Sequence, residues 1–190
     1  MKTALMLLEI QNDYFTNGRI PLEKSDEVAT NARSLLQIFR EEKMPVIHIQ
    51  QISTQPDAAY LLPCTKGADF HLSLQPIQHE TVVKKHYYNS FKDTVLLNYL
   101  IKHQINHLVL CGMMTHTSIA ATAYAAYDLG FHCTVVQDAC ATQALEFNQV
   151  RIPVDHVHLA FLASLQTPYA NVLNTYQLIQ KMNARVPVDA

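Results

Sequence analysis

The sequence predicts an α/β domain built on a parallel sheet that helices cover on both faces. Short, continuously apolar runs alternate with segments of helical periodicity along the 190 residues. Strands of this kind are typical of parallel sheets that are buried on both sides. The composition agrees, because 49% of the residues are hydrophobic and 16% are charged, as in a globular chain with a substantial core.

The first elements alternate as this fold requires. Residues 4–10 form an apolar run, interrupted only by Glu9 near its end, that predicts the first strand, and residues 23–43 place apolar side chains at helical spacing. Pro45 opens a second strand over residues 46–49. Residues 51–78 follow as a loop with proline and glycine breakers, and a loop of that length in a compact domain usually carries function.

The middle of the chain continues the alternation. Residues 81–84 predict a third strand and residues 94–103 a helix. Residues 108–111 predict a fourth strand, which leads into an alanine-rich helix over residues 117–129. Gly130 is expected to cap that helix, since glycine adopts the left-handed conformation that ends many helices.

The last third predicts two further strands and two further helices. Residues 133–136 are expected to form a fifth strand and residues 170–173 a sixth. Residues 156–165 and 175–182 have helical character. We therefore expect one α/β domain over residues 1–183, followed by a short tail over residues 184–190.

Composition excludes several classes of function. The longest apolar runs are too short to span a membrane, and a formal net charge of −2 gives no support for nucleic-acid binding. The N-terminal apolar stretch ends at Glu9 without a small-residue cleavage site, which favours a strand over a signal peptide. The four cysteines lack paired spacing, so we expect reduced thiols and a cytoplasmic protein.

Polar residues follow several of the predicted strands at their carboxyl ends, where parallel sheets bind ligands. Glu9 closes the first strand, Lys84 and Lys85 the third, and Ser118 follows the fourth at a helix start. In the mechanism that these residue types favour, Glu9 takes or relays a proton and Ser118 attacks a carbonyl. Lys85 keeps the carboxylate ionised, and the backbone N–H groups of Met114 and Ser118 receive the oxyanion.

Three segments, in order along the chain, resemble a known family. They read Leu7-Leu-Glu-Ile-Gln-Asn-Asp-Tyr-Phe15, Lys85-His-Tyr-Tyr-Asn-Ser-Phe91 and Gly112-Met-Met-Thr-His-Thr-Ser118. They are similar to the opening strand, the lysine segment and the nucleophile segment of the isochorismatase-like hydrolases, also called cysteine hydrolases. The spacing within the second segment selects Lys85 over Lys84. The family normally has an aspartate where Glu9 stands and a cysteine where Ser118 stands.

The resemblance implies a three-layer α/β/α Rossmann-like sandwich with a six-stranded parallel sheet. It also implies a cis peptide bond just before Met114 and a homo-oligomer, either a dimer or a larger assembly. The implied activity is hydrolysis of a small amide or related C–N bond by an altered Glu-Lys-Ser triad. The residues expected to contact such a small-molecule substrate are Gln11, Phe15, His48, Tyr88 and His116.

We expect neither a metal nor another cofactor. Nicotinamidase relatives bind a metal beside the active site through an Asp-x-His pair and a later histidine. The corresponding residues here, Gln50-Gln-Ile-Ser53, lack that pair, and two unlinked histidines, His48 and His71, make a poor metal site.

Several alternatives remain open at the level of sequence. Glu9 and Lys85 can form a purely structural ion pair, and Ser118 can be a helix-start hydroxyl without chemistry. The chain is then a catalytically impaired relative that keeps a binding pocket. Glu9 can also act as the general acid of a vinyl-ether hydrolase, the chemistry of the isochorismatases proper. A displaced nucleophile at Cys111 or Cys140 is a further alternative.

Overall fold

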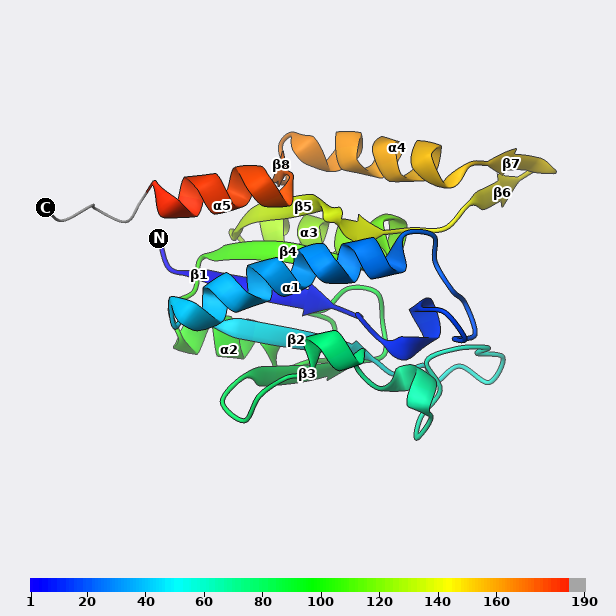
Figure 1. Ribbon diagram of the computed structural model, residues 1–190, viewed down its shortest axis with the longest axis horizontal. Helices are drawn as coiled ribbons and strands as arrows, with labels where there is room; N and C mark the ends of the chain where they lie inside the picture. Colours follow the sequence, from blue (N-terminus) through cyan, green and yellow to red (C-terminus); the bar gives the residue numbers. More distant parts are fainter. Residues whose placement is uncertain (185–190) are drawn as a thin grey trace, which may run out of the picture.

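The structure is a computed structural model that describes residues 1–184, folded as three layers around a central sheet (Figure 1). Six parallel strands have the order β3-β2-β1-β4-β5-β8. Their bounds are Thr3–Leu8 for β1, Val46–Gln51 for β2, Thr81–Lys85 for β3, His107–Met113 for β4, His132–Ala141 for β5 and Asn171–Leu173 for β8. This confirms the predicted fold class and the six-stranded sheet. The division of the chain at residue 183 stays a prediction, because residues 185–190 lie outside the described part.

Helices cover both faces of the sheet. Their bounds are Ser25–Glu41 for α1, Leu96–Lys102 for α2, Ala120–Asp128 for α3, Val154–Gln166 for α4 and Thr175–Asn183 for α5. Figure 1 shows α1 in front of the sheet and α2 and α3 behind it. Helix α1 packs against β5 and α5, whereas α3 packs against β5 and α4. Helix α5 begins with a capping box between Asn174 and Gln177, which satisfies two amide donors of its first turn.

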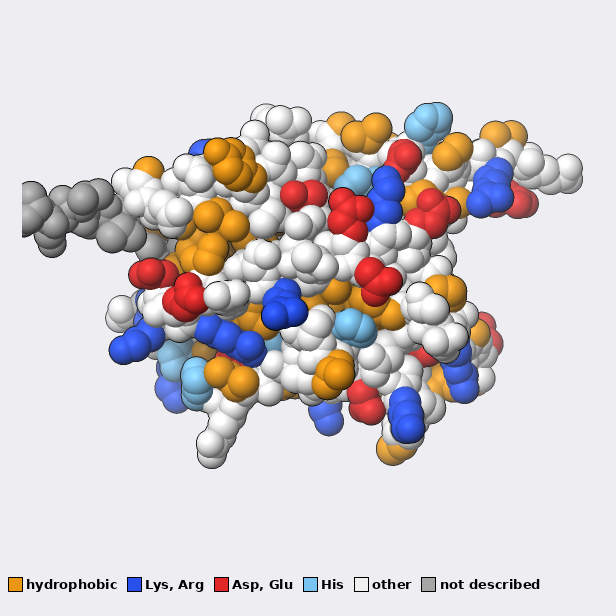
Figure 2. Space-filling view, viewed as in Figure 1, with side chains coloured by type: hydrophobic (Ala, Val, Ile, Leu, Met, Phe, Trp, Pro, Cys, Tyr) orange, Lys and Arg blue, Asp and Glu red, His pale blue; other side chains and the backbone are white. Residues whose placement is uncertain are grey.

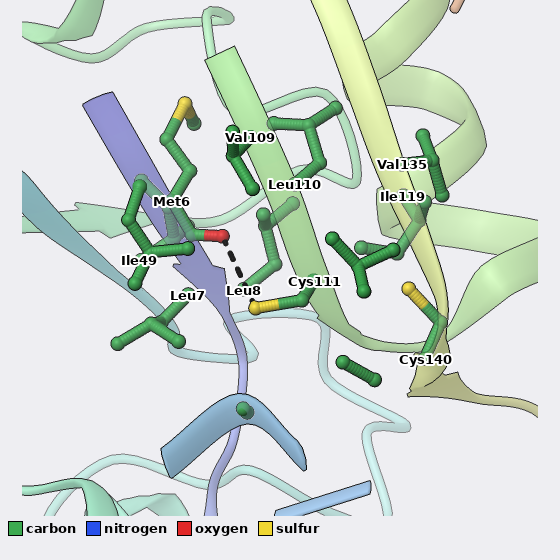
Figure 3. Close-up of a cluster of buried hydrophobic side chains, with 14 of the residues drawn as sticks. Met6, Leu7, Leu8, Ile49, Val109, Leu110, Cys111, Ile119, Val135 and Cys140 are labelled. Carbon is green, nitrogen blue, oxygen red and sulfur yellow. Dashed lines mark hydrogen bonds between the residues drawn. The ribbon is translucent and has the colours of Figure 1, made fainter. Parts of the chain in front are cut away.

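The core lies between these layers. Every residue of β1 and β4 is buried, as expected of inner strands of a parallel sheet. Figure 3 shows Cys111 of β4 packed among Met6, Leu7 and Ile49, with its Sγ 3.9 Å from the Met6 carbonyl oxygen. Acidic and basic side chains are interspersed on the surface over α1 (Figure 2). Within the described residues, no helix is both long and apolar enough to cross a membrane.

Strand β1 ends two residues earlier than predicted. Glu9 has a φ of 53°, in the left-handed region that residues other than glycine rarely adopt, so the strand stops at Leu8. Gly112 of β4 pairs with Leu8, and a Cβ on Gly112 would lie 1.9 Å from the Leu8 carbonyl oxygen. The glycine therefore lets β4 approach β1 closely beside Glu9.

Two other segments differ from the predictions. Residues 117–129 were expected to form one helix, but a π-helical turn over Thr115–Ile119 precedes α3. The antiparallel hairpin of β6 (Leu145–Phe147) and β7 (Val150–Ile152) was not predicted. Its strands are only three residues long, too short for a detectable alternation. Figure 1 shows the hairpin projecting beyond the start of α4.

Candidate active site

A carboxylate, an ammonium and a hydroxyl meet at the carboxyl edge of the sheet. The Lys85 Nζ lies 2.7 Å from Glu9 Oε1 and donates a hydrogen bond of 3.0 Å to Ser118 Oγ. The Ser118 hydroxyl donates to the same Glu9 oxygen and closes a triangle. All three residues are at most 1% exposed. The structure therefore brings together the three residues that the sequence nominated for catalysis.

Each member of the triangle comes from the end of a different strand. The left-handed conformation of Glu9 follows β1 directly, and Lys85 is the last residue of β3. Ser118 lies in the π-helical turn after β4. The peptide bond between Met113 and Met114 is cis, as the family resemblance implied. The Met114 carbonyl then accepts from the Thr117 and Ile119 N–H groups, each at 3.2 Å, which fixes the turn.

The Lys85 ammonium has no donor to spare. Besides Glu9 and Ser118, its Nζ donates a hydrogen bond of 2.6 Å to the Tyr88 carbonyl. An ammonium has three N–H donors, so these partners satisfy it completely. Burial lowers the pKa of Lys85, and the Glu9 carboxylate opposes that shift by pairing with the charge.

Tyr14 is a fourth residue of the site, and its polar contact was not predicted from the sequence. Its hydroxyl donates a hydrogen bond of 3.2 Å to Glu9 Oε2, the oxygen that the triangle leaves open. Burial raises the pKa of Tyr14 well above its ordinary value, and the Glu9 charge adds to the shift. The hydroxyl is thus a neutral donor, and both Glu9 oxygens have partners. The turn that follows Glu9 places the Tyr14 ring beside the Glu9 carboxylate, so no sequence pattern predicts this contact.

A cavity of about 420 Å³ opens above the triangle. Its walls are formed by Glu9, Tyr14, the loop over residues 51–61 and the turn over residues 86–88. Lys85 and Ser118 are not among the lining residues. Because Ser118 is fully buried and bonded to Glu9, the carboxylate stands between the hydroxyl and the cavity. A substrate can reach Ser118 Oγ only after the Glu9 side chain moves.

Asp13 and Gln11 anchor the loop over residues 51–61, which forms one wall of the cavity. Asp13 accepts hydrogen bonds from the Leu61 N–H at 2.6 Å and from the Arg19 N–H at 3.2 Å. Gln11 donates to the carbonyls of Gln51 at 2.9 Å and of Ala68 at 2.6 Å, so it ties the start of this loop to the segment that follows the loop. Both residues are buried. They hold the wall from outside the cavity.

Of the five residues expected to contact substrate, only Tyr88 lines the cavity. The buried Gln11 serves the loop, and Phe15 stacks on His71 with ring centroids 3.9 Å apart. His116 lies in the π-helical turn and bonds to Thr142, and burial lowers the pKa of His116. A role in substrate binding stays a prediction for these residues. The oxyanion role of the Met114 and Ser118 N–H groups also stays a prediction.

His48 faces a buried carboxylate instead of the cavity. It is fully buried, and its Nε2 lies 2.8 Å from Glu80 Oε2. Glu80 also accepts from Arg40 Nε at 2.7 Å and from the Ile77 N–H at 3.0 Å. Burial alone raises the pKa of Glu80, but hydrogen bonds from Arg40, Ile77 and His48 outweigh it and lower this pKa to about 2. Burial lowers the pKa of His48, so its neutral ring donates Nε2–H to the carboxylate.

The buried cysteines do not have the properties of nucleophiles. Burial raises the pKa of Cys111 far above its ordinary value and that of Cys140 to about 12. Nucleophilic cysteines have lowered pKa values because the thiolate attacks. Figure 3 shows both side chains within the apolar cluster. Among residues 1–184, no group of three or more histidine, cysteine and acidic side chains is arranged to hold a metal.

Comparisons with known proteins place this geometry in context. The family model for the isochorismatase domain matches residues 3–173. The chain is 43% identical over 175 residues to an uncharacterized isochorismatase family protein, YddQ, of Bacillus subtilis, covering 92% of this chain and 97% of that protein. It is 31% identical over 139 residues to a streptothricin hydrolase of Streptomyces noursei, covering 73% of this chain and 49% of the relative. The crystal structure of an isochorismatase from Pseudomonas putida KT2440 superposes with a TM-score of 0.87 at 30% identity, covering 93% and 89% of the two chains.

Proposed function

The chain belongs to the isochorismatase family and is a hydrolase of that family, and from this premise we propose that it cleaves a small amide or related C–N bond. The observation that carries the proposal is the closed hydrogen-bond triangle of Glu9, Lys85 and Ser118 at the floor of a cavity. A hydroxyl that donates to a carboxylate is a nucleophile already in contact with its base. The cavity of about 420 Å³ has room for a small molecule.

The proposed reaction begins when Glu9 takes the Ser118 proton and the Ser118 oxygen bonds to the substrate carbonyl carbon. The carbonyl oxygen becomes an oxyanion, which the N–H groups of Met114 and Ser118 receive. The C–N bond then breaks, and the proton on Glu9 passes to the leaving nitrogen. Water hydrolyses the resulting acyl ester with Glu9 again as the base, which releases a carboxylic acid and restores Ser118.

Two features of the site set the conditions of this reaction. A hydroxyl is a far weaker acid than a thiol, so Ser118 needs the direct contact with Glu9 that the structure provides. The Lys85 ammonium lies against both the carboxylate and the hydroxyl, where it stabilises developing negative charge. The reacting carbonyl must come within about 3 Å of Ser118 Oγ, so as substrate binds the Glu9 carboxylate has to turn aside from the cavity floor while it keeps its hydrogen bond with the Ser118 hydroxyl.

A second candidate function follows from the same geometry. Of the three residues, only Glu9 lines the cavity, so once its carboxylate has taken up a proton it can pass that proton to a bound substrate without the movement that access to Ser118 requires. A vinyl-ether hydrolase that uses Glu9 as the general acid fits this observation. Lys85 and Ser118 then only hold the carboxylate in place.

Turnover of a substrate panel by matched variants separates these functions. We propose to incubate the protein with small amides, activated esters and vinyl ethers, and to follow products by mass spectrometry. Amide hydrolysis through Ser118 predicts that Ser118→Ala lowers kcat by roughly 10⁴-fold or more, while an exposed α1 control, Ser34→Ala, has no effect. Vinyl-ether hydrolysis instead survives Ser118→Ala and is lost in Glu9→Gln.

A third outcome identifies a decayed site. If the natural protein turns over none of these compounds, but Glu9→Asp/Ser118→Cys gains amidase activity, the chain has kept the pocket and lost catalysis. That result contradicts the proposed function. The cytoplasmic location and the homo-oligomer also stay proposals, and light scattering on the purified protein tests the second.

A further inference from the structure

The walls of the active-site cavity carry tyrosines and carboxylates, and no lysine or arginine is among the lining residues of the described chain. We propose that the substrate carries a cationic group, such as a protonated or quaternary amine, and no carboxylate. The inference rests on the proposed function in one respect, because it takes the cavity beside Glu9 to be the place where the substrate binds. The recognition itself depends only on the cavity walls.

The one cation at the cavity floor is not available to a ligand. All three N–H donors of Lys85 are taken by Glu9, Ser118 and the Tyr88 carbonyl. Its side chain is fully buried behind Glu9. A substrate carboxylate would therefore meet Glu9 directly, without a counter-ion to offset the repulsion. Binding of an anionic group here is disfavoured.

Tyrosine rings supply the opposite kind of surface. Tyr14 and Tyr60 both line the cavity, with ring centroids 6.0 Å apart and planes inclined by 57°. Tyr88 lies beside them, and burial together with this neighbour raises the pKa of Tyr60 to about 12. The Tyr14 and Tyr60 hydroxyls thus stay neutral. Aromatic rings attract ammonium groups through the quadrupole of the ring, so several tyrosines that line one cavity favour a cationic ligand.

Two further groups of the lining favour a cation or an N–H donor. The Asp57 carboxylate lies on the same wall as Tyr60 and is exposed at the mouth. The buried Gln51 Oε1 has no hydrogen-bond partner among the described residues, so it is an acceptor that the protein leaves unsatisfied. His86 donates its Nδ1–H to the Ile52 carbonyl and thus turns that donor away from a ligand.

One further tyrosine of the cavity lining, Tyr87, already contacts a cation of the same chain. The Lys92 ammonium lies 3.9 Å from the centroid of the Tyr87 ring. Tyr87 is therefore not part of the proposed binding surface, which consists of Tyr14, Tyr60 and Tyr88 with Asp57 at the mouth. We call this surface the tyrosine wall.

Three benzamides whose 4-substituents carry a positive, no or a negative charge test the proposal. The substituents are trimethylammoniomethyl, its neutral isostere neopentyl, and carboxymethyl. We would measure their affinities for the full-length protein by isothermal titration calorimetry. The tyrosine wall predicts that the cation binds about tenfold more tightly than the neutral isostere, and the carboxylate most weakly.

Matched variants assign the preference to the wall. Tyr60→Leu removes a ring face and Asp57→Asn removes a charge, and each should lower the cation-to-neutral ratio about threefold. Tyr60→Phe, which keeps the ring, should preserve the ratio, as should Asp128→Asn on the exposed end of α3.

The outcomes separate this inference from the proposed function. A cation-to-neutral ratio of one or less, a preference for the carboxylate, or no binding of any compound at millimolar concentration overturns the inference. If the cation is preferred but no amide is ever hydrolysed, the proposed function fails while the tyrosine wall stands.

Discussion

Replacement of Lys85 by methionine tests whether the buried triangle is an energetic unit. Methionine is unbranched and apolar, so Lys85→Met keeps much of the side-chain volume and removes only the charge and its donors. In the folded protein, the Lys85 and Glu9 side chains are 0% and 1% exposed, and their charged atoms are 2.7 Å apart. The variant therefore leaves a buried carboxylate without its counter-ion.

The structure sets the size of the effect. Removal of one partner of a buried ion pair costs about 3–5 kcal/mol, because the other charge stays desolvated. Glu9 keeps hydrogen bonds from Ser118 and Tyr14, so we expect the lower end, about 3 kcal/mol of unfolding free energy. In Glu9→Gln/Lys85→Met no unpaired charge remains, so the double variant should lose only about 1 kcal/mol.

Urea unfolding, followed by circular dichroism, measures both quantities. The exposed neighbour on the same strand provides a control, since Lys84→Met should change the unfolding free energy by less than about 0.5 kcal/mol. The reasoning is refuted if Lys85→Met costs no more than this control. It is equally refuted if the double variant is less stable than Lys85→Met alone.

Three further predictions concern the surroundings of the triangle. Asp13→Ala should cost about 2–3 kcal/mol of stability and speed hydrogen exchange at the Leu61 amide, because the buried anchor of the cavity wall is lost; unchanged exchange contradicts this role. Tyr14→Phe removes a donor to the Glu9 carboxylate and should lower the unfolding free energy by about 1.5–3 kcal/mol in urea titrations, whereas an unchanged stability shows that Tyr14 only packs. The pKa of Glu80 is lowered from 4.5 to about 2 on folding, so its contribution to stability is present above pH 4.5 and lost as the pH falls toward 2. Glu80→Gln should abolish that loss, about 3 kcal/mol, in urea titrations at several pH values, and an identical acid dependence in both proteins contradicts it.

The sequence was sufficient for the fold and for the triangle because both follow from strong local rules. Continuously apolar runs between helical segments predict a parallel sheet, and the carboxyl ends of its strands collect Glu9, Lys85 and Ser118. Gly112 begins the segment that resembles the family's nucleophile segment, and its lack of a Cβ permits the close approach of β4 to Leu8. These features are set by residues near one another in the chain or by the topology alone.

Other features depend on contacts that no local pattern encodes. His48 follows the strand alternation into the core because Glu80, 32 residues later, offers a buried acceptor. The Tyr14 hydroxyl reaches Glu9 only because Glu9 adopts a left-handed conformation. The shielding of Ser118 likewise depends on where the longer Glu9 side chain comes to rest.

Peptide mapping of the acid-quenched protein during amide turnover tests the central claim most directly. We predict that the peptide containing Ser118 gains the mass of the substrate acyl group, and that Glu9→Gln shows no such gain because the base is missing. Turnover at an undiminished rate in Ser118→Ala, with no acyl group ever found on that peptide, would contradict the account.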